Sequence, residues 1–300
     1  MPQDHGRSRP PAGVVVGIGD QGPETYGAAV RLGAEEASLR QVPLRLVHDS
    51  SPAGAEGLAS RSGMKHRQQR GRRLVNGAAR DLARTRLGRG LRISTESSPQ
   101  TGVEVLLAQG RTAVMLVLQR AGGWLLPAGR TISAVTAASG CPTFVTRSAP
   151  APAGDVGVLV VLDPGHDPTP LITLALTEAF LRGTALTVLH RPGDRDDALS
   201  AVRAVGEQAH DIPVRWTDVP TARRADQVRE VSQGASLMVV VRPAAGEPDS
   251  LATAAYDEAR CPVLMVDAGV RTPRGGGAGR AWPGPVVDGA PPPAGSRPSP

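Results

Sequence analysis

A few residues of this sequence are of types that carry out chemistry, but none has the neighbours that a catalytic or metal site requires. His48 and His190 end the apolar segments LRLVH and LTVLH without a cysteine, aspartate or second histidine at metal-ligand spacing, so packing or turn hydrogen bonds are expected. Cys141 and Cys261 each precede a proline far apart in the chain, which predicts two small buried hydrophobes. Asp163 has no nucleophile or base at a recognisable spacing. We therefore predict that the protein is not an enzyme.

The segment from Arg61 to Arg92 is strongly basic, with eleven Lys or Arg and a single acidic residue, Asp81. Helical periodicity separates a cationic side from an apolar side, made respectively by Arg73, Arg80 and Arg84 and by Leu74, Ala78 and Leu82. One interpretation is a surface for nucleic acid or an acidic partner, because clustered cations release counterions when they meet phosphates. The other, which we favour, is a solvated helix face in an arginine-rich protein.

Short apolar segments alternate with helical ones along residues 13–148. The run VVVGI has no polar position, which is typical of a strand buried on both faces of a parallel sheet. After it, Ala29, Leu32 and Ala37 share one face of a helix, and Glu36 and Arg40 lie off that face. The pattern predicts strands at 14–18, 44–48, 91–95, 113–118 and 143–146, and helices at 25–40, 65–86, 103–108 and 131–138. Alternation of this kind predicts an α/β fold with helices on both faces of a parallel sheet.

The same order returns in residues 155–268, so the chain contains an internal repeat. LRLVH matches LTVLH, MLVLQR matches LMVVVR, and GCPTFVTR matches RCPVLMVD. Strands are predicted at 156–163, 185–190, 213–217, 236–242 and 262–267, and helices at 171–182, 197–209 and 227–233. Residues 149–154 read as a linker, whereas residues 1–12 and the Gly- and Pro-rich tail 269–300 are predicted to be disordered.

Three stretches of the first half, VVVGI, AAVRLGAEEASLRQVPLRLVH and AVMLVLQRAGGWLLPAGRTISAVTAASGCPTFVTR, resemble the universal stress protein family. The likeness covers residues 13–147, and residues 155–267 resemble a second, more diverged copy, as in tandem members common in actinobacteria. The resemblance implies two five-stranded, Rossmann-like domains of the adenine nucleotide alpha hydrolase type. It also implies that domains pair through their last strands, either between the two halves or between chains.

Many members of that family bind ATP through an Asp after the first strand and a loop of pattern GxxG, nine residues, then Gly and Ser or Thr. Small residues in such a loop let backbone amides approach phosphate at a helix N-terminus. Gly19 stands in the place of the Asp, and Leu118 and Ala121 replace the first two glycines. In the second half the Asp is present, but RPAAGEPDS contains one glycine. The residues that remain as candidate nucleotide contacts are Gly122, Gly123, Gly129, Arg130, Asp163 and Gly165.

Composition narrows the setting of the protein. No apolar run reaches the roughly 18 residues of a membrane span, and the N-terminal residues lack the apolar core of a secretory signal, so we expect a cytoplasmic protein without membrane contact. Aromatic residues make up 2% of the chain, too few for the stacking platforms that bind single-stranded nucleic acid.

Three hypotheses follow for the function. The first is a non-catalytic regulatory or binding module of the stress response, with degraded ATP loops, no required cofactor, and a protein partner or a second copy as its partner. The second is a nucleotide sensor in which the first-half glycine loop and Arg130 hold ATP. The third is binding of nucleic acid or an acidic partner through Arg61–Arg92, and nucleic acid is the partner we favour least.

Overall fold

The protein is described by a computed structural model, which covers residues 12–20, 22–23, 26–51, 61–120, 127–147, 156–163, 166–205, 211–220, 223–243 and 250–267. In this part of the chain the first half alternates strands and helices from beginning to end. Its elements are β1 (Val14–Ile18), α1 (Gly27–Leu39), β2 (Leu44–Asp49), α2 (Arg61–Arg84), β3 (Ile93–Ser98), α3 (Gly102–Gly110), β4 (Met115–Arg120), α4 (Pro127–Ala138) and β5 (Thr143–Arg147).

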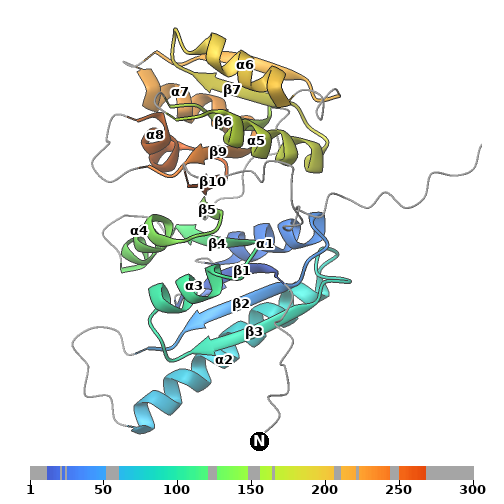
Figure 1. Ribbon diagram of the computed structural model, residues 1–300. Coiled ribbons are helices and arrows are strands. Elements are labelled where there is room, and N and C mark those ends of the chain that lie inside the picture. The colour runs from blue at the N-terminus through green and yellow to red at the C-terminus, as the bar shows by residue number, and fades with distance from the viewer. Residues whose placement is uncertain are drawn as a thin grey trace, which may run out of the picture. The chain divides into compact units, whose positions relative to one another are not determined.

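The second half repeats this order (Figure 1). Its elements are β6 (Gly157–Val161), α5 (Thr169–Arg182), β7 (Leu186–His190), α6 (Arg195–Val205), β8 (Val214–Asp218), α7 (Arg224–Val231), the 3-10 turn η4 (Ser232–Gly234), β9 (Ala235–Val241), α8 (Leu251–Glu258) and β10 (Val263–Val266). The internal repeat seen in the sequence is therefore a repeat of structure.

All ten strands of the described residues form one sheet, in the order β3-β2-β1-β4-β5-β10-β9-β6-β7-β8. Within each half every strand pair is parallel, as predicted. The two halves meet where β10 pairs with β5 in the antiparallel direction (Figure 1). Pairing through the last strands thus occurs between the two halves of one chain.

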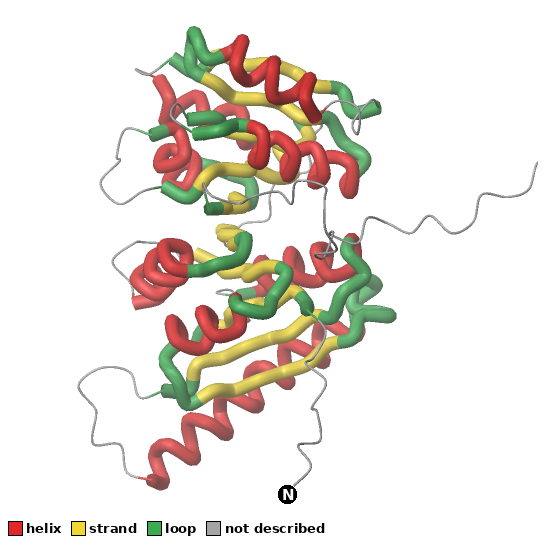
Figure 2. The backbone as a smooth tube through the Cα atoms, viewed as in Figure 1, coloured by secondary structure: helices red, strands yellow, loops and turns green. Residues whose placement is uncertain are grey.

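Helices cover both faces of the sheet, and each face has its own apolar core (Figure 2). In β1, Val14 and Val16 enter the core beneath α1, whereas Val15 enters the opposite core beneath α3 and α4. Successive side chains of a strand point to opposite faces, so a strand that is buried on both faces has apolar residues at every position. This explains the unbroken run VVVGI and confirms the predicted fold class.

Element boundaries differ from the prediction in a few places. β3 begins two residues later than expected. Only Ser98 of its six residues is buried, so the alternation of apolar and polar residues that would mark its start is weak. Helix α8 was not predicted, because its two turns are too short to show a clear helical period. A local signal existed, since Ser250 precedes the apolar run and its side chain accepts a hydrogen bond from the backbone N–H of Thr253. Except for Ala12, the predicted disordered ends and linker lie outside the described residues, and the domain boundaries remain predictions.

Candidate functional site

The second half holds Asp163 two residues after the end of β6, at the edge of the sheet where its strands end. Its two carboxylate oxygens accept hydrogen bonds from the first backbone amides of α8, Oδ1 from Leu251 N and Oδ2 from Ala252 N, each at 2.8 Å. Arg191 lies 3.5 Å from the same carboxylate. A carboxylate at the positive end of a helix dipole, with two charge-assisted hydrogen bonds, is a strongly favoured arrangement.

The amides of the first turn of α8 are therefore already satisfied. Ser250 Oγ accepts from Thr253 N at 2.9 Å, so three successive amides of this turn have acceptors from within the chain. A helix N-terminus binds phosphate only through free amides. Asp163, expected from the sequence to contact a nucleotide, is the acceptor of two of these amides, and its nucleotide contact stays a prediction. Gly165 lies outside the described residues.

The first half differs at the equivalent positions. Gly19 follows β1 where Asp163 follows β6, and the next residue, Asp20, turns to His48 on β2. Nδ1 of His48 is 2.9 Å from the carbonyl oxygen of Ile18, which can only accept, so Nδ1 carries a proton. Nε2 lies 3.3 Å from Asp20 Oδ1, and this contact is attractive when Nε2 is protonated as well.

The electrostatics of this pair follow from its surroundings. Burial opposes the charged form of His48, but its hydrogen bonds to Asp20 and to Ile18 outweigh burial and raise its pKa. The same hydrogen bond, together with the nearby Arg70 and Arg67, lowers the pKa of Asp20. Helix α2 comes close because Gly71 lacks a side chain, since a Cβ there would lie 2.5 Å from the His48 ring. The pair therefore links β2 to the end of β1, and the contact between His48 and Asp20 is an ion pair when His48 is protonated.

Two of the four predicted contacts in the first half lie in α4, which begins at Pro127. Gly129 and Arg130 belong to its first turn, and nothing is described of the Arg130 side chain. Gly122 and Gly123 lie outside the described residues. The helix was expected to begin at residue 131, so α4 begins four residues earlier and takes in Gly129 and Arg130, which were expected in the loop. Their role as nucleotide contacts stays a prediction.

Gln119 on β4 is a residue at this edge that sequence reasoning missed. Its Oε1 accepts hydrogen bonds from the first amides of α1, Ala28 N at 2.9 Å and Ala29 N at 3.2 Å. Helix α1 has no cap of its own, because the Tyr26 side chain does not reach an amide. A signal was present in the sequence, since Gln119 is polar within the apolar strand MLVLQR and its counterpart in LMVVVR is Val241.

Arginines at matching positions of the repeat fasten the two halves together. Arg120, at the end of β4, donates to Tyr256 O and contacts Asp257 near the end of α8, and its guanidinium stacks over the Tyr256 ring. Arg242 follows β9 at the matching place and donates to Ser139 O just beyond α4. Each half therefore caps a helix C-terminus of the other, where a cation is favoured.

A buried ring of four charges also joins the halves. Glu36 and Arg40 from α1 meet Glu178 and Arg182 from α5, and each arginine pairs with both glutamates. Both glutamate side chains are 1% exposed. The expectation that Glu36 and Arg40 lie off the apolar side of α1 is wrong, because Glu36 follows Ala29 by two helical turns and is buried on the same side, where the second half covers it. The repeated spacing Glu-x-x-x-Arg, eight residues before Leu44 and Leu186, was the available signal.

The other predicted features fall as follows. The cationic side of α2 is exposed at Arg73, Arg80 and Arg84, whereas Ala78 and Leu82 are buried. Cys141 and Cys261 are free and buried, which confirms the interpretation of both as small hydrophobes. Among the described helices, none is long and apolar enough to cross a membrane. In the same residues no three His, Cys, Asp or Glu side chains gather in a metal-binding group.

Two repeated five-stranded parallel units with helices on both faces define the chain as a tandem α/β protein of the Rossmann-like type. No family model matches it. In sequence it is similar to two universal stress proteins of Mycobacterium tuberculosis, strains CDC 1551 and H37Rv, each 31% identical over 197 residues. The matched region is 61% of this chain and 65% of either relative, so the chain spans less than two thirds of their length.

Solved structures agree on the fold. A universal stress protein from Archaeoglobus fulgidus superposes with a TM-score of 0.66 at 10% identity, covering 86% of this chain and 97% of that one. A functionally unknown protein from Pseudomonas aeruginosa PAO1 gives 0.55 at 15% identity, covering 85% and 92%. The chain is therefore a homologue of universal stress proteins in sequence, and it has their fold.

Proposed function

We propose that this protein is a non-catalytic regulatory or binding module of the universal stress type, whose second half has given up nucleotide binding. The observation that carries the proposal is the carboxylate of Asp163 on the first two amides of α8. A phosphate at this helix end would have to displace a charge that is already bound, and the two anions would repel each other if both stayed.

The last strands of the two halves also have no edge at which a further strand could pair. β5 pairs with β4 and β10, and β10 pairs with β5 and β9, so neither strand has a free edge. A second copy or a protein partner would have to use another surface. Self-association through the last strands, one of our expectations for this chain, is therefore not part of the proposal. The cationic side of α2 is exposed, and binding of an acidic partner or nucleic acid to it stays a prediction.

The test is a calorimetric titration of ATP, with and without magnesium, into the full chain. We expect no saturable heat, and no rise in melting temperature at millimolar ATP. Saturable binding that is lost on Asp163→Ala would overturn the proposal, because it would make this carboxylate a ligand contact instead of an internal cap. Gln119→Ala serves as a control for general damage at the same sheet edge, since it also removes the acceptor of a helix N-terminus.

The second candidate, a nucleotide sensor in the first half, has one observation in its favour. No carboxylate equivalent to Asp163 follows β1, because Gly19 stands there and Asp20 contacts His48. Gly129 and Arg130 lie in the first turn of α4. In the same titration this candidate predicts micromolar binding that survives Asp163→Ala and is lost on Arg130→Ala.

A further inference from the structure

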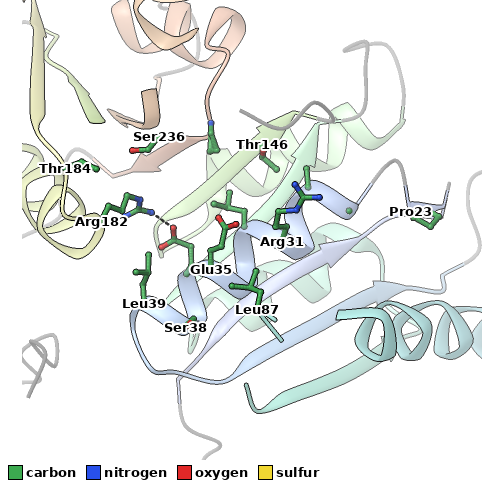
Figure 3. A pocket seen from close by; sticks show the side chains of 15 residues that line it. Pro23, Arg31, Glu35, Ser38, Leu39, Leu87, Thr146, Arg182, Thr184 and Ser236 are labelled. Carbon is green, nitrogen blue, oxygen red and sulfur yellow. Dashed lines mark hydrogen bonds and ion pairs between the residues drawn. The ribbon is translucent and has the colours of Figure 1, made fainter. Parts of the chain in front are cut away.

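A hollow of about 700 Å³ lies between α1 and the second half (Figure 3). The side chains of Arg31, Glu35 and Ser38 from α1 line one wall, with Leu39 and Leu87 beside them. Thr146, Thr184, Ser236 and Pro262 line other parts of it, and the ion pair of Arg182 with Glu36 lies within it. The lining also includes Pro23, Gly27, Ala28 and Leu32. Its volume is within the range of cavities that hold small molecules.

The internal repeat supplies a comparison for this hollow. The strand registers and the two Glu-x-x-x-Arg pairs align the halves residue by residue, so every lining position has a counterpart on the other side of the ring. The counterparts of Arg31, Glu35, Ser38, Thr146, Thr184 and Ser236 are Thr173, Thr177, Phe180, Val266, Val42 and Val114. Six polar positions on one side therefore correspond to four apolar residues and two threonines on the other.

The hydroxyl donors of the two threonines are already used within α5. Thr173 and Thr177 each donate to a carbonyl oxygen one turn earlier in α5, at 2.7 and 2.9 Å. If the polar groups of the hollow were needed only to join the halves, both sides would need them. Their concentration on one side points instead to a ligand that binds there.

Two charged side chains of the hollow lie outside the ion ring. Arg31 and Glu35 are one helical turn apart on α1, and the side chain of neither makes a hydrogen bond or an ion pair within 4 Å to the described part of the chain, although the charges of Arg31 and Arg182 act on Glu35. Crowding around its carboxyl group raises the pKa of Glu35, opposed by the charges of Arg31 and Arg182, although the side chain as a whole remains exposed. The Thr184 hydroxyl is buried and has no hydrogen-bond partner among the described residues. A buried polar group without a partner is uncommon and calls for a physical explanation.

We propose that this hollow binds a small zwitterion that carries a carboxylate and an ammonium group, the chemistry shared by a free α-amino acid and a dipeptide. Arg31 pairs with the carboxylate and Glu35 with the ammonium, as their charges require. Leu39, Leu87 and Pro262 contact the apolar part of the ligand, and Thr184 supplies a hydrogen bond. The proposal is independent of the nucleotide question, because none of these residues belongs to α4 or α8.

The experiment is calorimetry on the full chain with L-leucine and L-leucyl-L-leucine as probes. N-acetyl-L-leucine lacks the ammonium and L-leucinamide lacks the carboxylate, so each tests one charge. We expect saturable binding of at least one zwitterion. Each of the two blocked compounds should bind at least about tenfold more weakly. Whether L-leucine or L-leucyl-L-leucine binds more tightly shows whether the hollow is suited to an amino acid or to a dipeptide. Absence of saturable binding of both at about 10 mM would overturn the proposal.

Variants assign the charges. Arg31→Gln should lower the affinity for the zwitterion about tenfold and abolish the preference for the zwitterion over L-leucinamide. Glu35→Gln should also lower the affinity for the zwitterion about tenfold, and it should abolish the preference for the zwitterion over N-acetyl-L-leucine. Thr184→Val, which installs the residue found at position 42, should weaken binding about threefold to tenfold without lowering the melting temperature. The matched controls Thr173→Val and Thr177→Val lie on the other side of the ring and should leave binding unchanged. Binding that survives both Arg31→Gln and Glu35→Gln would contradict the assignment.

Discussion

The two halves share one topology, yet they treat the ends of their strands differently. In the second half, Asp163 holds the first turn of α8. In the first half, Asp20 holds His48, and Gln119 holds the first turn of α1. By contrast, the contacts that join the halves are matched, with Arg120 mirrored by Arg242 and the ion ring built from equal parts. The repeat has kept what joins the halves and has diverged at the edge where ligands bind in such folds.

The largest expected effect lies in the matched part. Glu36→Leu should cost about 3 to 5 kcal/mol of unfolding free energy, because it leaves two buried guanidinium groups with one carboxylate, so that one positive charge is uncompensated. Glu178→Leu should cost a similar amount, since each glutamate serves both arginines. Urea denaturation checks both, with Glu35→Leu as the exposed neighbouring control, for which a change within about 0.5 kcal/mol is expected. A large difference between the two variants would break the symmetry inferred here.

The next effect distinguishes the halves. Asp163→Ala removes the acceptor of two helix amides and should destabilise the protein by about 1 to 2 kcal/mol. Asp20→Ala removes a contact of an exposed carboxylate and should cost less than about 1 kcal/mol at neutral pH. Thermal unfolding of the two variants side by side gives the comparison. Equal losses would show that the two aspartates have similar structural roles.

The smallest effect concerns pH and the first half alone. The pKa of His48 is raised in the folded protein above its ordinary value of 6.5, so its contribution to stability is complete below that pH and is lost as pH rises through the folded pKa. The charge of Asp49 also raises the pKa of His48, whereas Arg67 and Arg70 lie near Asp20. We expect the contribution of this contact to the free energy of unfolding to be modest, under about 1 kcal/mol.

Urea midpoints between pH 5.5 and 8.5 measure this contribution against Asp20→Asn, which keeps the shape of the side chain and removes its charge. The difference in stability between the protein and this variant should shrink as the pH rises. A difference that stays constant over the range would show that the contact does not depend on the imidazolium.

The sequence went far toward the fold because its signals were local. VVVGI and MLVLQR are long enough to show that strands are buried on both faces, and the matched segments of the two halves reveal the repeat. Helix α8 was missed, since eight residues after a segment rich in proline and glycine carry too little periodicity. The role of Asp163 was hidden for a related reason. Its partners lie 88 and 89 residues away, on the helix that was not predicted.

By itself, the sequence determined the order of the elements other than α8 and a parallel sheet with helices on both faces, because hydrophobic periodicity reports the burial of each segment directly. Only the tertiary structure decided which polar groups face each other. Glu36 was expected off the apolar side of its helix, yet it lies on the buried side with Ala29, where Arg40 and, from α5, Arg182 compensate its charge. Asp163 has the type and place of a ligand contact, and it is a helix cap because α8 begins beside it. Hydrogen bonds and ion pairs depend on distances of a few ångströms between residues far apart in the chain, and no local pattern encodes those distances.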